Sequence, residues 1–267
     1  NVVTPMALLE QYGSDAVRYW SVRARPGVDT AFDEGEMRIG RRLAIKLLNA
    51  SKFALSVMGD DTPRADAVDA PVDRSMLGAL HDVVETATRS FDEFDYARAL
   101  EVTERFFWNF CDDYLELVKQ RAYGSRGDDA ARSARAALAV AVSTLHRLFA
   151  PHLPFVAEEV WSWWQPSSVH TSDWPHVEEL GVQGGDSSVY DVSAAVLSEI
   201  RKAKSTAQRS MRTEVTAATV HLPPELSAAL DLGLDDVRDA GNVVGDVAVE
   251  AGDELRVDVE LAPPESD

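Results

Sequence analysis

The chain has 267 residues and a hydrophobic content of 45%, which suffice to bury the core of one large or two smaller domains. Its single cysteine, Cys111, excludes an internal disulfide and a zinc site of the CxxC type. The formal net charge of -19 opposes nucleic acid at long range, but physiological salt screens charges beyond about 8 Å, so local basic patches decide. No apolar stretch is long enough to span a membrane and no secretory signal is recognisable, so we expect a cytosolic protein.

The first part of the sequence predicts three helices. Thr4 is a suitable N-cap for the first helix, and Gly13 ends it. Either Ser14 or Asp15 suits the N-cap of the second helix. A longer third helix follows over residues 33–58, where leucine, isoleucine and alanine recur at helical spacing.

A helix bundle is predicted for the middle of the sequence. Residues 59–72 contain two prolines and four aspartates and are predicted to form a linker. Helical periodicity then recurs over four segments, at residues 75–89, 96–123, 128–149 and 154–164. Cys111 lies in an apolar run, which predicts a buried and unreactive thiol. Long amphipathic helices joined by short loops indicate an antiparallel bundle.

The pattern changes after residue 165. Residues 168–174 are predicted to be short and extended, and residues 181–188 form a loop rich in glycine, serine and aspartate. The remaining predicted elements are a helix at 189–209, strands at 215–222, 243–250 and 254–261, a helix near 225–232, and a frayed end at 263–267. The predicted fold is therefore mainly α, with a small α/β appendix at its C-terminal end.

One predicted helix carries a basic face. Residues 37–58 contain no acid in a chain with 45 acidic residues. Helical spacing places five of its polar side chains on one face: Arg38, Arg42, Lys46, Asn49 and Lys52. A solvated surface, or positive charge attracted by a helix dipole, is the alternative explanation. The dipole explanation is weak here, because the face starts near a helix N-terminus, so contact with RNA phosphates is the functional interpretation.

Two further basic clusters follow. Residues 200–213 also lack acids and carry Arg201, Lys202, Lys204, Arg209 and Arg212. A third cluster, formed by Lys119, Arg121 and Arg126, closes the predicted helix at 96–123. Lys119 and Arg121 lie in the last turn of that helix, where the dipole explains positive charge without a ligand.

No catalytic constellation is recognisable. The six histidines are dispersed, and HExxH, phosphate-loop, dinucleotide-binding and nucleophile-elbow motifs are absent from the sequence. Asp112-Asp113 and Glu158-Glu159 are adjacent pairs on predicted helices, so their side chains diverge by about 100° and solvated surface is favoured over acid–base catalysis. Trp161, Trp163 and Trp164 suit base stacking, but tryptophans at the end of a helix more often belong to a bundle core.

Segments along the chain match a known family, in order and with suitable spacing. They are NVVTP and YGSDAVR (residues 1–5 and 12–18), DTAF and KLLNASKF (29–32 and 46–53), FFWNFCD and YLE (106–112 and 114–116), and PHLPF to EEVW with SVH to WP (151–161 and 168–175). Over about residues 1–205 the chain resembles valyl-tRNA synthetases, which are class I aminoacyl-tRNA synthetases. The first segment is similar to the one that follows the family's KMSKS loop, so we expect an excised C-terminal fragment.

The resemblance implies a division of labour. Residues 1–33 would be a helical connector after the KMSKS loop, residues 34–180 the anticodon-binding helix bundle, and residues 187–262 the α/β appendix. The full-length enzyme would attach valine to tRNA-Val with ATP and Mg²⁺ and edit mischarged tRNA, as a monomer that binds neither DNA nor membrane. Catalytic and editing domains would lie outside this chain, which we expect to be inactive alone and to hold no cofactor or metal.

The basic face coincides with the anticodon-binding helix that the resemblance implies. The expected tRNA-binding residues are Arg38, Arg42, Lys46, Asn49 and Lys52, together with Lys119 and Arg121. The basic residues would contact phosphates. Asn49 would either contact a base or, buried between helices, satisfy backbone groups; both interpretations are open.

The sequence departs from the family pattern at two places. Asp113 stands where such enzymes usually have an aromatic residue, so the packing there is expected to differ. Many bacterial valyl enzymes end in a long coiled coil, whereas the segment after Arg212 has strand-like runs and no heptads. The alternative assignments are the same part of an isoleucyl enzyme, or a non-enzymatic helical module that binds another protein.

Overall fold

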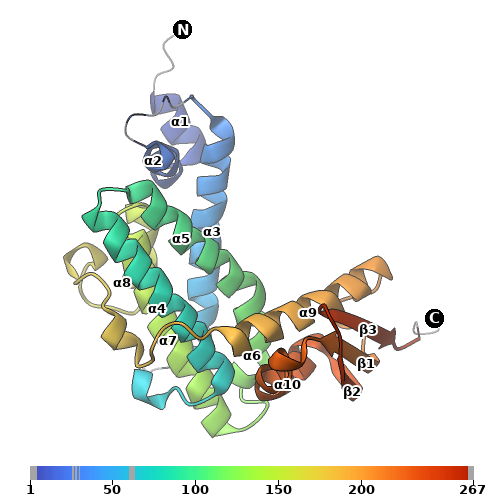
Figure 1. Cartoon of the computed structure of the whole chain (residues 1–267). Coiled ribbons are helices and arrows are strands. Elements are labelled where there is room, and N and C mark those ends of the chain that lie inside the picture. Colours follow the sequence, from blue (N-terminus) through green and yellow to red (C-terminus); the bar gives the residue numbers. More distant parts are fainter. Residues whose placement is uncertain (1–4, 26, 28, 30, 60–63, 264–267) are drawn as a thin grey trace. The chain divides into compact units, whose positions relative to one another are not determined.

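The computed structural model describes residues 5–25, 27, 29, 31–59 and 64–263 (Figure 1). Within these residues the chain is mainly α-helical with one small sheet near its end, so the predicted fold class is confirmed. The chain divides into two compact units assembled from segments distant in sequence. The first unit comprises residues 1–66, 80–108 and 135–182, and the second residues 67–79, 109–134 and 183–267. The division into connector, bundle and appendix stays a prediction.

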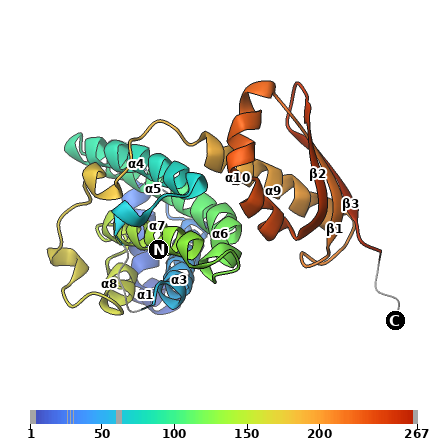
Figure 2. The same cartoon turned by 90° about the horizontal axis from the view of Figure 1, so that it is seen from below.

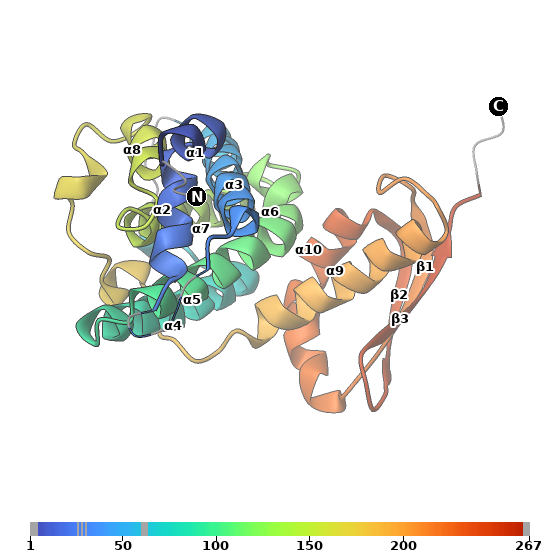
Figure 3. The same ribbon diagram turned by 90° about the horizontal axis from the view of Figure 1, so that it is seen from above.

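Helices build the described part of the first unit. They are α1 (Pro5–Tyr12), α2 (Ser14–Arg23), α3 (Glu34–Met58), most of α5 (Tyr96–Asn109), α8 (Pro154–Ser162), and the parts of α4 (Pro71–Asp92) after residue 79 and of α7 (Asp128–Phe149) after residue 134. Figure 3 shows α1, α2 and α8 gathered beside α3. The core includes the fully buried Met37 and Leu43 of α3. None of the described helices is long and apolar enough to cross a membrane.

Helix α3 is fixed by its start and by one glycine. The Asp33 carboxylate accepts a hydrogen bond from the backbone N–H of Gly35 at 2.6 Å, which caps the helix. A Cβ atom at Gly40 would lie 2.6 Å from Cβ of Tyr19, so only glycine allows α2 and α3 to approach so closely here. Tyr19 is fully buried, and its hydroxyl donates to Glu104. The predicted helix over residues 33–58 is thus confirmed almost to the residue.

The predicted helix caps at the start of the chain need correction. Thr4 lies outside the described residues, as do residues 264–267 of the predicted frayed end. Gly13, and neither Ser14 nor Asp15, occupies the N-cap of α2. The Asp15 carboxylate instead caps α8, far along the chain.

The predicted helix at residues 96–123 contains a π-helical insertion. Helix α5 ends at Asn109, a π-helical turn spans Phe110–Tyr114, and α6 (Leu115–Ala122) continues the chain. Cys111 lies in this turn as a buried thiol outside any disulfide, as predicted. Burial raises the pKa of the half-buried Asp113, although the positive charge of Arg201 opposes the shift. An extra residue in the turn shifts the apolar side chains around the helix, which a strict helical period does not reveal.

The second unit ends in a small α/β structure. Its described elements after residue 182 are α9 (Ser188–Thr206), β1 (Val215–Leu222), α10 (Ser227–Gly241), β2 (Val243–Ala251) and β3 (Arg256–Leu261). The strand order is β2-β1-β3, with β1 parallel to β2 and antiparallel to β3. Helices α9 and α10 pack on one face of the sheet (Figure 2). The alternating burial along β1 is the pattern by which the sequence predicts this strand.

Two predicted irregular segments contain short 3₁₀ turns. The linker at residues 59–72 includes a turn at Ala65–Ala67, and α4 starts at Pro71, earlier than predicted. The segment at residues 168–174 is not simply extended, because a 3₁₀ turn spans Val169–Thr171. Ser168 caps this turn with its hydroxyl oxygen, which accepts from the backbone N–H of His170 at 3.2 Å. Local side-chain capping of this kind competes with extended structure in short polar segments.

Candidate nucleic-acid interface

The basic face of α3 lies at the surface of the first unit. Arg38, Arg42, Asn49 and Lys52 are exposed, and Lys46 is half-buried. The side chains share one side of the helix because each follows the previous one by three or four residues. The opposite side of α3 packs into the core through Leu43 and Leu47. The structure therefore brings together the five α3 residues that the sequence predicts.

Two tryptophans from other helices line this face. The Arg42 guanidinium and the Lys46 ammonium each lie 5.7 Å from the ring centre of Trp108 on α5. The Lys52 ammonium lies 5.9 Å from the ring centre of Trp163, just after α8. Cations at this distance over an indole ring are attracted to its π-face. The arrangement alternates cations with aromatic rings, as surfaces that bind single-stranded nucleic acid do.

Each tryptophan is held by a glutamate one helical turn away. Indole Nε1 of Trp108 donates to Glu104 at 3.2 Å, and Nε1 of Trp163 donates to Glu159 at 3.1 Å. These hydrogen bonds fix the edge of each ring. Trp163 is 37% exposed, so part of its ring is open to a ligand. The two rings are therefore positioned before any ligand binds.

Part of the basic charge on this face is unneutralised. In the described part of the chain no carboxylate pairs with Arg42 or Lys52. Arg38 is 3.9 Å from Glu34, but its side chain is 65% exposed, where such a pair is weak. Arg105 is exposed, lies three residues before Trp108 and also has no described carboxylate partner. Phosphate groups would find several available cations here.

The centre of the face is polar and apolar at once. Asn49 is exposed, which removes the interpretation that it is buried between helices to satisfy backbone groups. Ile45, four residues earlier on the same side, is 52% exposed. An amide beside an apolar side chain offers hydrogen bonds to a base edge together with a surface for the base or ribose.

The sequence indicates some of these residues and misses others. Trp161, at 6% exposure, belongs to the core as predicted, and Trp164 is half-buried, but the prediction is wrong for Trp163. Trp108 lies within an apolar run of the sequence, and Arg105 lies on a helix that carries both charged and apolar residues. Their only sequence signal is helical spacing from one another, which does not reveal that α5 packs beside α3.

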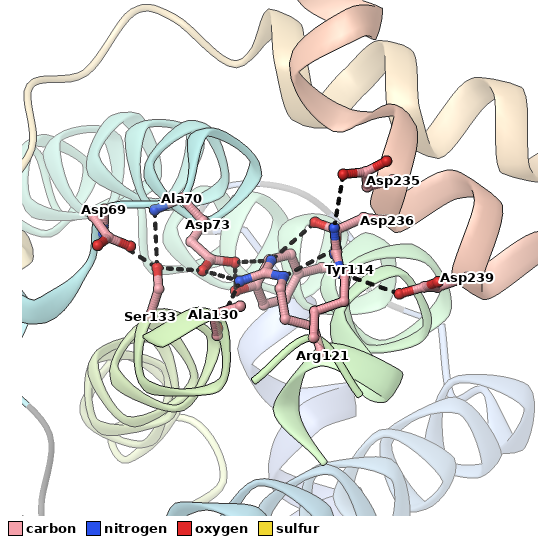
Figure 4. A network of polar contacts seen from close by, with 11 residues as sticks. Asp69, Ala70, Asp73, Tyr114, Arg121, Ala130, Ser133, Asp235, Asp236 and Asp239 are labelled. Carbon is pink, nitrogen blue, oxygen red and sulfur yellow. Dashed lines mark hydrogen bonds and ion pairs between the residues drawn. The ribbon is translucent and has the colours of Figure 1, made fainter. Parts of the chain in front are cut away.

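The structure corrects the expectation for Arg121. Its side chain is 3% exposed and makes a double ion pair in the second unit, with Asp73 at 2.6 Å and Asp236 at 2.9 Å (Figure 4). Burial acts to lower the pKa of Arg121, but the hydrogen bond and charge of Asp73 hold that pKa above its ordinary value. A guanidinium enclosed by two carboxylates has no free donor face for phosphate. Arg121 is therefore a structural residue.

More polar groups complete this buried network. Asp73 also accepts hydrogen bonds from the hydroxyls of Tyr114 and Ser133, and Arg126 pairs with Asp236. Lys119, by contrast, stays at the surface, 3.8 Å from Glu116. Its contact with tRNA remains a prediction.

One group of side chains has the spacing of metal ligands. His81, Asp82 and Glu85 of α4 place one ligand atom each within 4.8 Å of the others, and it is the one such group among the residues that the structure describes. Asp82 and Glu85 are exposed. A local group of this kind on one helix surface gives no reaction chemistry of its own.

Known proteins resemble this chain over part or nearly all of its length. Residues 73–220 match the family described as the anticodon-binding domain of tRNA ligase. The chain is 59% identical to a valine–tRNA ligase of Thermobifida fusca over 99% of its own length and 30% of that protein, and 54% identical to that of Salinispora arenicola over 98% and 32%. It thus spans about 30% of the length of these relatives. In fold it is similar to the LeuRS of Agrobacterium radiobacter K84, solved as a ternary complex with tRNA and LeuAMS (TM-score 0.57, 16% identity, 97% of this chain, 30% of that chain).

Proposed function

Because this chain belongs to the family of anticodon-binding domains of tRNA ligases, we propose that the face of α3 binds the anticodon arm of a tRNA. The observation that carries this proposal is the alternation of unneutralised cations with Trp108 and Trp163 on one surface. Arg38, Arg42 and Lys52, with Lys46, hold the phosphate backbone, and Asn49 contacts a base edge. Trp163 stacks on an unpaired base, because an aromatic face accepts any base.

The whole protein, in this proposal, is a valine–tRNA ligase. Relatives that carry this name align with nearly all of the chain. The complete enzyme attaches valine to tRNA-Val with ATP and Mg²⁺ in the cytosol, through domains that are not part of these 267 residues. The LeuRS complex with tRNA supports the choice of tRNA as ligand through the shared fold.

Phosphate contacts are tested by the salt dependence of binding. Lys52→Ala and Arg42→Ala, made singly in the full-length enzyme, are expected to weaken tRNA binding evenly across anticodon variants. Each should reduce the slope of log K against log salt by about one unit, since each phosphate contact releases about one counterion. Arg132→Ala, which removes an exposed arginine paired with Asp129, is the control. Unchanged slopes for both α3 variants would remove this face from the proposal.

The amino-acid assignment has its own test. A gel-shift competition with the full-length enzyme uses labelled tRNA-Val as the probe. An unlabelled tRNA with a valine anticodon should displace this probe at a lower concentration than an unlabelled tRNA with an isoleucine anticodon does. Equal competition would overturn anticodon recognition specific for valine. The isolated chain, in addition, should show no valine-dependent pyrophosphate exchange.

A further inference from the structure

A basic loop stands out in the acidic end of the second unit. Residues 183–267 contain 17 acidic and seven basic residues, and five of the seven basic residues lie between positions 201 and 212. The segment at residues 207–214, here named the α9–β1 loop, joins α9 to β1. It contains Arg209 and Arg212, which do not belong to the basic face of α3.

A buried lysine holds the backbone of this loop. Lys204 on α9 is 1% exposed, and its ammonium donates to the carbonyl of Met211 at 3.0 Å and to that of Gly241 at 2.7 Å. Burial lowers the pKa of Lys204, and the charge of Arg201 acts in the same direction. Lysine is rarely buried, because removing its charge from water is costly. Here the buried ammonium fixes the position of a loop carbonyl, that of Met211.

Other contacts fix the remainder of the α9–β1 loop. The Asn242 side chain donates to the carbonyl of Arg212 at 2.7 Å. The backbone N–H of Arg209 donates to the carbonyl of Lys204 at 2.8 Å. Gln208, directly before Arg209, has a backbone φ of 54°, which is unfavourable for a residue with a side chain. The loop backbone is therefore held in one conformation against strain.

The two arginines of the loop have no described carboxylate partner. Arg212 is exposed and Arg209 half-buried, and neither pairs with a carboxylate among the described residues. The basic residues of α9 differ, because Arg201 pairs with Glu116 and Lys202 with Glu199. The dipole of α9 favours positive charge at Arg209, but it does not account for Arg212, which lies six residues beyond Thr206, the last residue of α9.

The sheet beside the loop has the opposite charge. In register with alternate positions of β1 lie four acidic side chains of β2 and β3: Asp246, Glu250, Asp258 and Glu260. Asp258 pairs with Arg256, but the excess of carboxylates on this face disfavours phosphate, in contrast to the loop. Two fixed, unpaired arginines with an exposed methionine between them suit the backbone and ribose of RNA.

We propose that the α9–β1 loop is a second tRNA contact, separate from the α3 face, which binds backbone phosphates through Arg209 and Arg212 without reading sequence. The inference rests on the proposed function in that its ligand is the same tRNA. Lys204 is a positioning residue, which holds the loop and does not touch the RNA.

The test compares two RNAs with the full-length enzyme. Arg209→Ala/Arg212→Ala should weaken binding of whole tRNA and reduce the salt slope by about two units, equally for any anticodon. Binding of an isolated anticodon-arm hairpin should stay unchanged, because the proposal assigns the loop to a part of the tRNA outside that arm. Arg256→Ala is the matched control, since it removes an exposed arginine of β3 that pairs with Asp258.

Each outcome decides between the two contacts. A double variant with the salt slope of wild type would overturn the loop contact and leave the α3 proposal intact. Loss of hairpin binding in the double variant would overturn the claim that the loop contact is separate from the α3 face. If α3 variants bind the hairpin as wild type does, the proposed function fails while the loop result still stands. Lys204→Met removes no exposed charge, but it should weaken binding of whole tRNA and leave binding of the hairpin unchanged. If Lys204→Met binds whole tRNA with wild-type affinity, the positioning role of Lys204 is refuted.

Discussion

The carboxylate of Asp15 accepts a hydrogen bond from the backbone N–H of Val156 at 2.7 Å, across 141 positions of sequence. Its other oxygen accepts from the N–H of Phe155 at 3.1 Å. Two of the unpaired donors at the start of α8 are thus satisfied by a residue in the first turn of α2. Burial raises the pKa of Asp15, while these two hydrogen bonds act against that shift. The contact ties α2 to the helix that leads into Trp163.

Removal of this long-range cap should destabilise the protein. Asp15→Ala is expected to lower the free energy of unfolding by about 1–2 kcal/mol, because α8 loses the acceptor for two N–H groups. Asp15→Asn keeps one carbonyl acceptor and should lose less. Urea unfolding followed by circular dichroism measures both, with the exposed Glu10→Ala as control. Equal midpoints for Asp15→Ala and Glu10→Ala would show that the cap does not stabilise the fold.

The same contact explains which parts of the fold the sequence predicts. Helices α3 and α7 and strand β1 follow from local periodicity, and their observed bounds agree with the prediction to within a residue. Asp15 fits the local rule for an N-cap of its own helix, but its partner comes from α8. Pairing between distant segments depends on how helices pack, which a single-sequence pattern does not contain.

The candidate site shows the same limit. Arg38, Arg42 and Lys52 are predicted from an acid-free helix face, and they are exposed. Arg121 comes from a similar cluster, yet its carboxylate partners lie 48 and 115 positions away and bury it. A count of charges along one helix therefore finds basic faces but cannot separate a ligand contact from a buried ion pair.

Trp163 provides a test of base stacking that is independent of charge. Trp163→Ala in the full-length enzyme should weaken binding of the anticodon-arm hairpin by about tenfold, because a stacked base contributes about 1–3 kcal/mol. The salt slope should not change, since no phosphate contact is lost. Trp163→Phe should retain most of the affinity through its remaining ring. A hairpin titration in which all three proteins bind equally would place the anticodon elsewhere.

Arg121 should matter for stability and not for RNA. Arg121→Met leaves the buried Asp73 without a cation and Asp236 with Arg126 alone, so we expect a loss of about 3–5 kcal/mol in the free energy of unfolding. Arg132→Ala, at an exposed pair, should leave the unfolding midpoint almost unchanged. Where Arg121→Met remains folded, the salt slope of tRNA binding should equal that of wild type. A slope lower by one unit would restore Arg121 as a phosphate contact.

His146 is expected to make the stability of the first unit depend on pH. Its Nε2 lies 2.7 Å from Oγ of Ser51, and that hydroxyl donates its only proton to the carbonyl of Leu47 at 2.8 Å. Nε2 must therefore carry the proton of the neutral ring and donate to Oγ. Nδ1 is left buried with no partner among the described residues, so a second proton would have no acceptor. Burial accordingly lowers the pKa of His146 to about 3.

The sign of the pH effect follows from linkage. An unfolded histidine has a pKa of about 6.5, so below that pH the unfolded state binds a proton that the folded state does not accept. The free energy of unfolding should fall as the pH drops from 6.5 toward 3, with a contribution approaching about 1.4 kcal/mol per pH unit. His146→Gln can still donate to Ser51 but does not titrate, so its slope between pH 6 and 5 should be shallower by about 1 kcal/mol per unit. His176→Gln, at an exposed histidine, controls for loss of a histidine as such. Parallel slopes for wild type and His146→Gln would mean that His146 accepts a proton in the folded protein, which contradicts the hydrogen-bond direction deduced from Ser51.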